Sequence, residues 1–167
     1  MKIAIVGGAG GIGSSVAFNL LRTNDPYEIV IIDNRDNMIV SHVMDLQDAL
    51  SLGGAKSVVG GKMSDAMDAD IVVLSAAVPL TINTSRDVYL KANADIVGGI
   101  VDQLVAGEFA GILLLMTNPV DPLLTWVARR TGWAPRPPRF LWAPPVSAAR
   151  SPRPTMARQV PRSRVVR

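Results

Sequence analysis

The stretch Met1–Gly13, MKIAIVGGAGGIG, decides the fold, because a short apolar run ends there in a cluster of glycines. Residues 3–6 are rich in β-branched side chains and too short for a helix, which predicts a strand buried on both faces. The glycines that follow match the pattern G-x-G-x-x-G at Gly8, Gly10 and Gly13. This pattern is typical of a tight turn from a strand into a helix.

Such a turn suits a bound pyrophosphate. The first glycine permits a backbone conformation that a Cβ would oppose, and the second lets a phosphate approach the main chain. The third lets the helix lie tightly on the strand. The N–H groups at the start of the helix, from Gly11, Ile12 and Gly13, have no helical partner, and together with the helix dipole they favour an anion. The alternative is a glycine-rich turn that binds nothing.

A carboxylate follows at the spacing expected for a ribose contact. The second predicted strand, residues 28–32, ends in Asp33, which lies twenty residues beyond Gly13. An acidic residue at this point accepts hydrogen bonds from the hydroxyls of an adenosine ribose. Because a carboxylate repels a 2′-phosphate, the sequence favours NAD over NADP, and the nearby Arg35 keeps that preference moderate.

Strands and helices alternate along the rest of the chain. We predict strands at residues 3–6, 28–32, 56–59, 70–76 and 112–116, with helices after Gly13 and over residues 35–50, 86–106 and about 119–130. This rhythm predicts a doubly wound α/β Rossmann fold with a parallel sheet of about five strands in the order 3-2-1-4-5. Ligands bind beyond the carboxyl ends of such strands, where Gly8–Gly13, Asp33, Ala76–Ala77 and Asn118 should meet.

The spacing of apolar residues predicts which helix faces are buried. In the first helix these residues are Ile12, Val16 and Leu20. In the helix over residues 86–106 they are Ala92, Ile96, Ile100 and Leu104, with Val97, Val101 and Val105 beside them.

Composition excludes several classes of site and protein. The 167 residues suit one domain and contain no cysteine, which removes disulfides, thiolate metal sites and cysteine nucleophiles, and we predict no metal site. No apolar run approaches the roughly 20 residues of a membrane span, and the N-terminal run is too short for a secretory signal. We therefore expect a cytoplasmic protein without a membrane partner.

The charge divides the chain into two predicted parts. Residues 1–133 carry nine Lys and Arg against 14 acids, whereas residues 134–167 carry eight Arg, eight Pro and no acid. We expect a dinucleotide-binding domain over 1–133 and a disordered tail over 134–167, with a poor extra strand at residues 139–143 as the alternative. The tail is either a genuine segment or the product of a frameshift in a GC-rich gene. We do not expect it to bind nucleic acid.

Six stretches together resemble the NAD-dependent malate and lactate dehydrogenases. They are IVGGAGGIGSSVA (5–17), VIIDNRD (30–36), MDLQDA (44–49), DADIVVLSAAVP (68–79), SRDVYLKANADIV (85–97) and MTNPVDPLLTWVA (116–128). The similarity covers about residues 1–133. It implies a Rossmann domain that binds NAD and acts on a small 2-hydroxy or 2-oxo acid, in a protein that forms homo-oligomers.

The resemblance also implies roles for single residues. Gly8, Gly10 and Gly13 would hold the pyrophosphate and Asp33 the ribose, Ala76 and Ala77 would line the nicotinamide side, and Asn93 would lie near cofactor or substrate. Arg86 aligns with the arginine that polarises the substrate carbonyl, and Asn118 with the asparagine that holds this carbonyl and the catalytic imidazole. A solvated arginine and a helix N-cap are the respective alternatives.

The sequence departs from this family at Leu80, at Asp48, which stands where a histidine is common, and in what it lacks. Leu80 stands where malate-type members carry an arginine, which favours a monocarboxylic acid over malate. The histidine base, its aspartate partner and a second substrate-binding arginine come from the family's C-terminal half, which has no counterpart here. His42, the single histidine, is expected to be structural or exposed. We therefore expect a truncated or frameshifted form with little activity, or alternatively a non-catalytic nucleotide-binding module.

Overall fold

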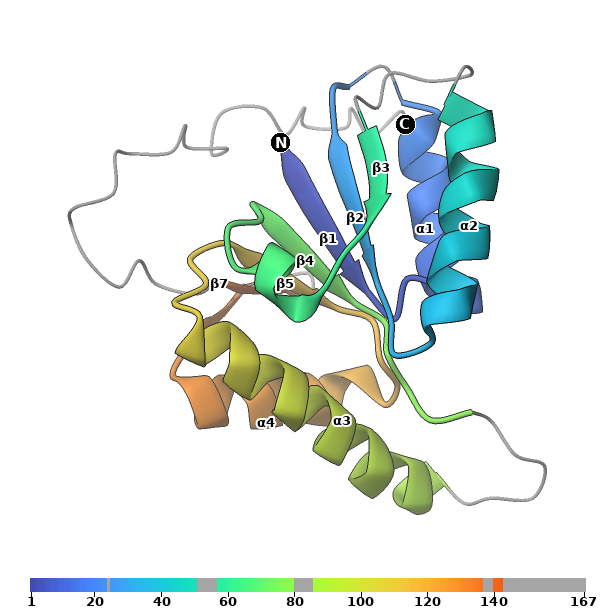
Figure 1. Ribbon diagram of the computed structural model, residues 1–167. Helices are drawn as coiled ribbons and strands as arrows, with labels where there is room; N and C mark the ends of the chain where they lie inside the picture. Colours follow the sequence, from blue (N-terminus) through green and yellow to red (C-terminus); the bar gives the residue numbers. More distant parts are fainter. Residues whose placement is uncertain (24, 51–56, 80–85, 137–139, 143–167) are drawn as a thin grey trace, which may run out of the picture.

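The computed structural model describes residues 1–23, 25–50, 57–79, 86–136 and 140–142. These described residues form seven strands, four α-helices and one 3-10 helix, η2 (Figure 1). The strands are β1 (Lys2–Val6), β2 (Glu28–Ile32), β3 (Ser57–Gly60), β4 (Ile71–Leu74), β5 (Ile112–Leu115), β6 (Ala134–Arg136) and β7 (Phe140–Trp142). The helices are α1 (Gly11–Leu21), α2 (Asp36–Ala49), η2 (Met63–Ala66), α3 (Arg86–Ala106) and α4 (Val120–Thr131).

The first five strands form the predicted parallel sheet in the order β3-β2-β1-β4-β5, which confirms the doubly wound topology. Central β1 pairs with β2 on one side, with Ile5 opposite Ile31, and with β4 on the other, with Ile5 opposite Val73. All three of these side chains are buried. The aliphatic runs are therefore explained by a sheet that is covered on both faces.

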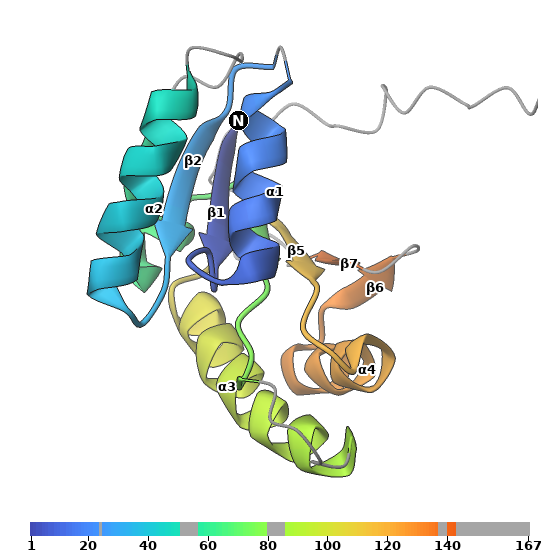
Figure 2. The same ribbon diagram turned by 90° about the vertical axis from the view of Figure 1, so that its right-hand side faces the viewer.

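Two apolar cores lie on opposite faces of the sheet, because successive side chains of a strand point to opposite sides. Ile3, Ile5, Ile29 and Ile31 pack with residues of α1 and α2. The alternate positions of β1 and β2 pack on the other face, with residues of α3 and α4. Figures 1 and 2 show the two helix pairs on either side of the strands.

The first residues beyond Trp133 add to the sheet. β7 pairs antiparallel with β5, and β6 pairs antiparallel with β7 at the end of the sheet. The prediction of a disordered tail is therefore wrong for residues 134–136 and 140–142, and the alternative of an extra strand holds for 140–142. The edge of β5 is covered. The other tail residues lie outside the described part of the chain.

Two predicted helix faces need correction. In α1 the buried residues are Gly13, Ala17 and Leu21, whereas Ile12 is 49% exposed. Small side chains face the sheet because α1 lies close to it, and this moves the buried face by one position. In α3 the buried apolar residues are Val97, Val101 and Leu104, and Val105 is exposed.

Among the described residues, no helix has the length and apolarity needed to cross a bilayer.

Candidate functional site

The corner between β1 and α1 is built by glycines that approach other main-chain atoms. Gly7 has a φ of +80°, and a Cβ on it would lie 2.5 Å from the Ala76 nitrogen. A Cβ on Gly13 would overlap the Gly7 carbonyl oxygen and lie 2.7 Å from the Gly8 Cα. The sequence predicts the unusual backbone conformation at Gly8, but it lies at Gly7. Gly8 is needed for a different reason, because its Cβ would lie 2.8 Å from the Ile5 carbonyl oxygen.

The outer side of the same corner is open. The Gly10 N–H donates to the Gly7 carbonyl at 3.0 Å, and a Cβ on Gly11 would meet no atom within 4 Å. The N–H groups of Gly11, Ile12 and Gly13 are the first of α1, and no described residue accepts them. Unpaired N–H groups at a helix N-terminus suit the oxygens of a phosphate. The predicted residues Gly8–Gly13 therefore lie in one corner that is able to receive an anion.

Asp33 is bound into this corner from the end of β2. Its Oδ2 accepts from the Ala9 N–H at 3.1 Å, and its Oδ1 from the Asn34 N–H at 3.0 Å. Arg35 donates to both oxygens, from Nε to Oδ1 at 3.0 Å and from Nη2 to Oδ2 at 3.3 Å. The Asp33 side chain is only 5% exposed, whereas that of Arg35 is 51% exposed. Asp33, the residue predicted to bind ribose, is thus already paired with the Arg35 guanidinium.

These contacts set the ionisation of Asp33. Burial opposes its charged form, but the hydrogen bonds and charge of Arg35 and the N–H groups of Ala9 and Asn34 outweigh burial. The pKa of Asp33 therefore lies below the ordinary value of an aspartate. Asp33 is a stable anion at neutral pH.

We expect Asp33→Asn to lower the free energy of unfolding at neutral pH by about 1–2 kcal/mol, because hydrogen bonds to a charged group are lost. A lowered folded-state pKa contributes stability that is present above the unfolded-state pKa and is lost as pH falls through the folded value. The difference between the two proteins should therefore shrink in acid. Urea unfolding at several pH values tests this, and Asp45→Asn, at an exposed position of α2, is the control. A difference that stays constant with pH would contradict the assignment.

A second group of contacts connects the carboxyl ends of β1, β4 and β5. The Ser75 Oγ donates to the Val6 carbonyl at 3.2 Å, and the Thr117 Oγ1 donates to the Ala76 carbonyl at 2.9 Å. Ala76 is half-buried and the neighbouring Ala77 is exposed. Since Ala76 also touches the Gly7 position, the carboxyl ends of β1, β4 and β5 are in contact.

Asn93 of α3 joins the segments that follow these strands. It is 4% exposed, its Oδ1 accepts from the Val78 N–H at 2.9 Å, and its Nδ2 donates to the Asn118 carbonyl at 2.7 Å. The sequence did not reveal these contacts, because an asparagine within a helical pattern carries no sign of its distant partners. Gly7, Ser75 and Thr117 also contribute to the site but were not predicted. Their contacts are with residues distant in the sequence, which no local pattern reveals.

Of the two residues predicted to act on the substrate, Asn118 has a described side chain and Arg86 does not. Asn118 is exposed after β5, and the N-cap of α4 is Pro119 with no side-chain cap bond, so the N-cap alternative for Asn118 is wrong. Arg86 is the first residue of α3, but its side chain lies outside the described part of the structure, as does Leu80.

Known proteins share this sequence pattern and fold. The family model described as "lactate/malate dehydrogenase, NAD binding domain" matches residues 1–138 of this chain. The chain belongs to the lactate/malate dehydrogenase family. NAD is therefore the cofactor of its matched domain, and the unpaired N–H groups of the β1–α1 corner fit the anionic part of that cofactor.

The relatives of this chain in the family include lactate dehydrogenases and malate dehydrogenases. The chain is 38% identical over 132 residues to the L-lactate dehydrogenase of Lactobacillus delbrueckii subsp. bulgaricus, covering 79% of this chain and 43% of the relative. It is 30% identical over 137 residues to the malate dehydrogenase of Salinibacter ruber, covering 81% and 43%. The structure of Archaeoglobus fulgidus malate dehydrogenase in complex with NADH aligns with a TM-score of 0.73 and 29% identity, over 80% of this chain and 46% of that one. The chain spans less than half the length of these dehydrogenases.

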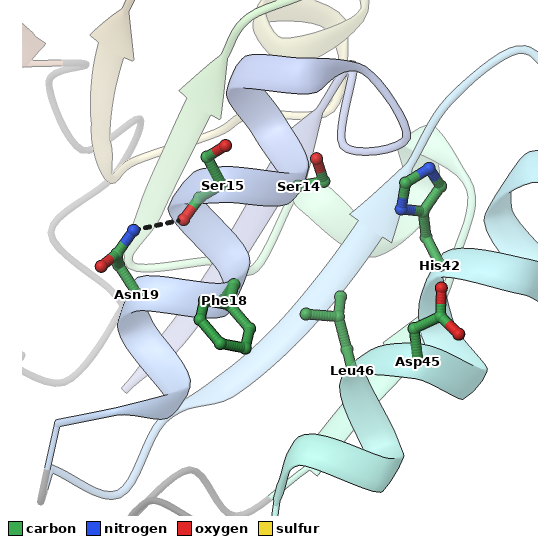
Figure 3. Close-up of a pocket in the computed structure, with 7 residues that line it drawn as sticks. All are labelled: Ser14, Ser15, Phe18, Asn19, His42, Asp45 and Leu46. Atoms are coloured by element: carbon green, nitrogen blue, oxygen red, sulfur yellow. Dashed lines mark hydrogen bonds between the residues drawn. The ribbon is translucent and has the colours of Figure 1, made fainter.

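This dehydrogenase-family chain also has a groove of about 350 Å³ between α1 and α2 (Figure 3). It is lined by Ser14, Ser15, Phe18, Asn19, His42, Asp45 and Leu46. His42 is half-buried and faces the groove from α2. Within the described ranges, no three His, Asp or Glu side chains are grouped to hold a metal ion.

Proposed function

We propose that this chain binds NAD at the β1–α1 corner as the cofactor-binding half of a 2-hydroxy acid dehydrogenase. The observation that carries the proposal is the set of unpaired N–H groups of Gly11, Ile12 and Gly13, with the Asp33 carboxylate held beside them by the Ala9 N–H. Together these groups provide donors for a pyrophosphate and an acceptor for ribose hydroxyls.

The predicted residues have separate roles in this proposal. Gly8, Gly10 and Gly13 keep the corner free of side chains, so that the main-chain donors can reach the pyrophosphate. Ala76 and Ala77 leave room at the end of β4 for the nicotinamide, which accepts or supplies a hydride when NAD is bound. The Asn118 side chain and the Arg86 guanidinium orient and polarise the carbonyl of the substrate. Asn93 acts as a positioning residue, because its Nδ2 holds the main chain at Asn118 through the Asn118 carbonyl.

We further propose that these 167 residues alone transfer little hydride. A proton must leave the substrate hydroxyl as hydride leaves its carbon, and a positioned base typically contributes 10²–10⁴-fold to such a step. The single histidine, His42, lines the groove between α1 and α2 instead of facing Asn118. A non-catalytic nucleotide-binding module is the second candidate, and this placement of His42 favours it.

The proposed substrate class rests on one side chain, that of Leu80, in the stretch of sequence that follows β4. We propose a monocarboxylic 2-oxo acid, because Leu80 cannot pair with a second carboxylate. The cytoplasmic location expected from the sequence is part of the same proposal.

Calorimetric titration of the purified chain with NADH tests the function directly. We expect NADH to bind, and Asp33→Ala to weaken binding about tenfold through loss of charge-assisted hydrogen bonds. Asp45→Ala, which removes an exposed carboxylate from α2, is the matched control and should leave NADH affinity unchanged. Absence of NADH binding to the folded wild type would refute the proposal.

The same preparation is then assayed for oxidation of NADH by mono- and dicarboxylic 2-oxo acids. Slow turnover, about 10²–10⁴-fold below that of a complete dehydrogenase, identifies the dehydrogenase half. Binding of NADH with no turnover of any 2-oxo acid supports the nucleotide-binding module instead.

A further inference from the structure

The ion pair at the end of β2 bears on which dinucleotide the chain accepts, and this inference rests on the proposed function. A carboxylate offers about four lone-pair directions to donors. Asp33 receives four contacts, two from the N–H groups of Ala9 and Asn34 and two from the guanidinium of Arg35. The acceptors that a ribose needs are therefore already in use.

Only the Arg35 contacts can be given up easily. The Ala9 and Asn34 donors belong to the main chain, and the Ala9 N–H lies in the glycine corner itself. The Arg35 side chain is long and 51% exposed, so it can turn into solvent without unfolding its surroundings. A ribose 2′-hydroxyl thus competes with Arg35 for the Asp33 oxygens.

A 2′-phosphate would interact with the Asp33–Arg35 pair differently from a ribose hydroxyl. An unpaired carboxylate repels it, but the charge of Asp33 is balanced by a guanidinium that contacts both oxygens. The planar fork of an arginine fits a phosphate as well as a carboxylate, so Arg35 can exchange one anion for the other. Asp36, the next residue, is exposed and opposes this exchange through its own charge, which is screened by solvent.

We propose that Arg35 is a specificity-determining residue that lets this site accept NADP(H) beside NAD(H). It withdraws from Asp33 when a free ribose binds, and it pairs with the 2′-phosphate when a phosphorylated ribose binds. Selectivity then depends on the side chain two positions after the ribose carboxylate, as well as on the carboxylate itself.

The test is a comparison of dissociation constants for NADH and NADPH, measured by calorimetry on the full chain. We expect Arg35→Ala to raise the ratio Kd(NADPH)/Kd(NADH) about tenfold, since a charge-assisted contact to the phosphate is lost while competition for Asp33 is relieved. NADH affinity should stay equal or increase. Arg35→Lys keeps the charge without the fork and should give an intermediate ratio. Arg129→Ala removes an exposed arginine from the last turn of α4 and should leave the ratio unchanged.

Two results would overturn the inference while leaving the proposed function intact. The first is a ratio in Arg35→Ala within twofold of the wild-type ratio, with NADH still bound. The second is equal ratios in Arg35→Ala and Arg129→Ala. Failure of NADH to bind wild-type protein would remove the proposed function and this inference together. NADH binding by the variants also reports that their site is folded.

Discussion

Replacing Gly13 by alanine should lower the free energy of unfolding by about 2–3 kcal/mol, which is typical of adding a methyl group where no space exists. The new Cβ would overlap the Gly7 carbonyl oxygen and the Gly8 Cα, and these are main-chain atoms that cannot turn aside like a flexible side chain. Relief requires α1 to move away from β1. Such a movement also displaces the unpaired N–H groups, so NADH binding should weaken together with stability.

Gly11→Ala is the matched control for this prediction. Both glycines belong to the first turn of α1, but a Cβ at Gly11 meets nothing within 4 Å. Since alanine favours the helix over glycine, this variant should be unchanged or more stable by about 0.5–1 kcal/mol. Urea unfolding of the three proteins decides the matter. Equal stability of Gly13→Ala and Gly11→Ala would show that the close packing of α1 on β1 has been misassigned.

The second large effect is expected for Asn93→Asp, an almost isosteric change. The new carboxylate can still accept from the Val78 N–H, but it cannot donate to the Asn118 carbonyl, which lies 2.7 Å from Nδ2 in the wild type. Two acceptors then face each other at a site that is only 4% exposed. We expect the free energy of unfolding at about pH 7 to fall by about 2–4 kcal/mol, as is usual when a buried charged group lacks a partner.

The pH dependence of this variant has a defined sign. When protonated, the introduced carboxyl can donate to the Asn118 carbonyl, so folding favours the protonated form and raises the pKa of the group. The stability that protonation restores is present below the unfolded-state pKa and is lost as pH rises through the folded value. The deficit relative to wild type should therefore be smaller at about pH 4 than at about pH 7.

Asn19→Asp provides the control for Asn93→Asp. The Asn19 Nδ2 also donates to a carbonyl, that of Ser15 at 2.8 Å, but on the exposed side of α1 (Figure 3). Water can replace this bond, so the change should stay within about 0.5 kcal/mol. A deficit of Asn93→Asp that equals that of Asn19→Asp, or that does not depend on pH, would contradict the role given to Asn93.

The sheet was predictable because its signal is local. Four-residue aliphatic runs such as Ile71–Leu74 indicate buried parallel strands, and the right-handed crossover expected between successive parallel strands restricts the strand order. The faces of α1 and α3 were less predictable, because the buried stripe depends on how closely a helix packs. Gly13 and Ala17 face the sheet although neither is strongly apolar, whereas Ile12 is exposed.

The site was predictable in its residues but not in its contacts. The spacing from Gly13 indicated Asp33, yet only the fold shows that Arg35 occupies the same carboxylate. Asn93 was indicated by the resemblance to dehydrogenases, but its two bonds join segments 15 and 25 residues away. Such contacts depend on the packing of α3, and no pattern within the helix specifies them.

The strand β7 has a practical consequence for anyone who shortens this chain. A cut at residue 133 would follow the limit of the sequence motifs, but it would remove β6 and β7 and leave the N–H and C=O groups of β5 without their antiparallel partner. Exposed strand edges of this kind recruit other molecules. An expression fragment should therefore extend at least through Trp142 to remain monodisperse during purification.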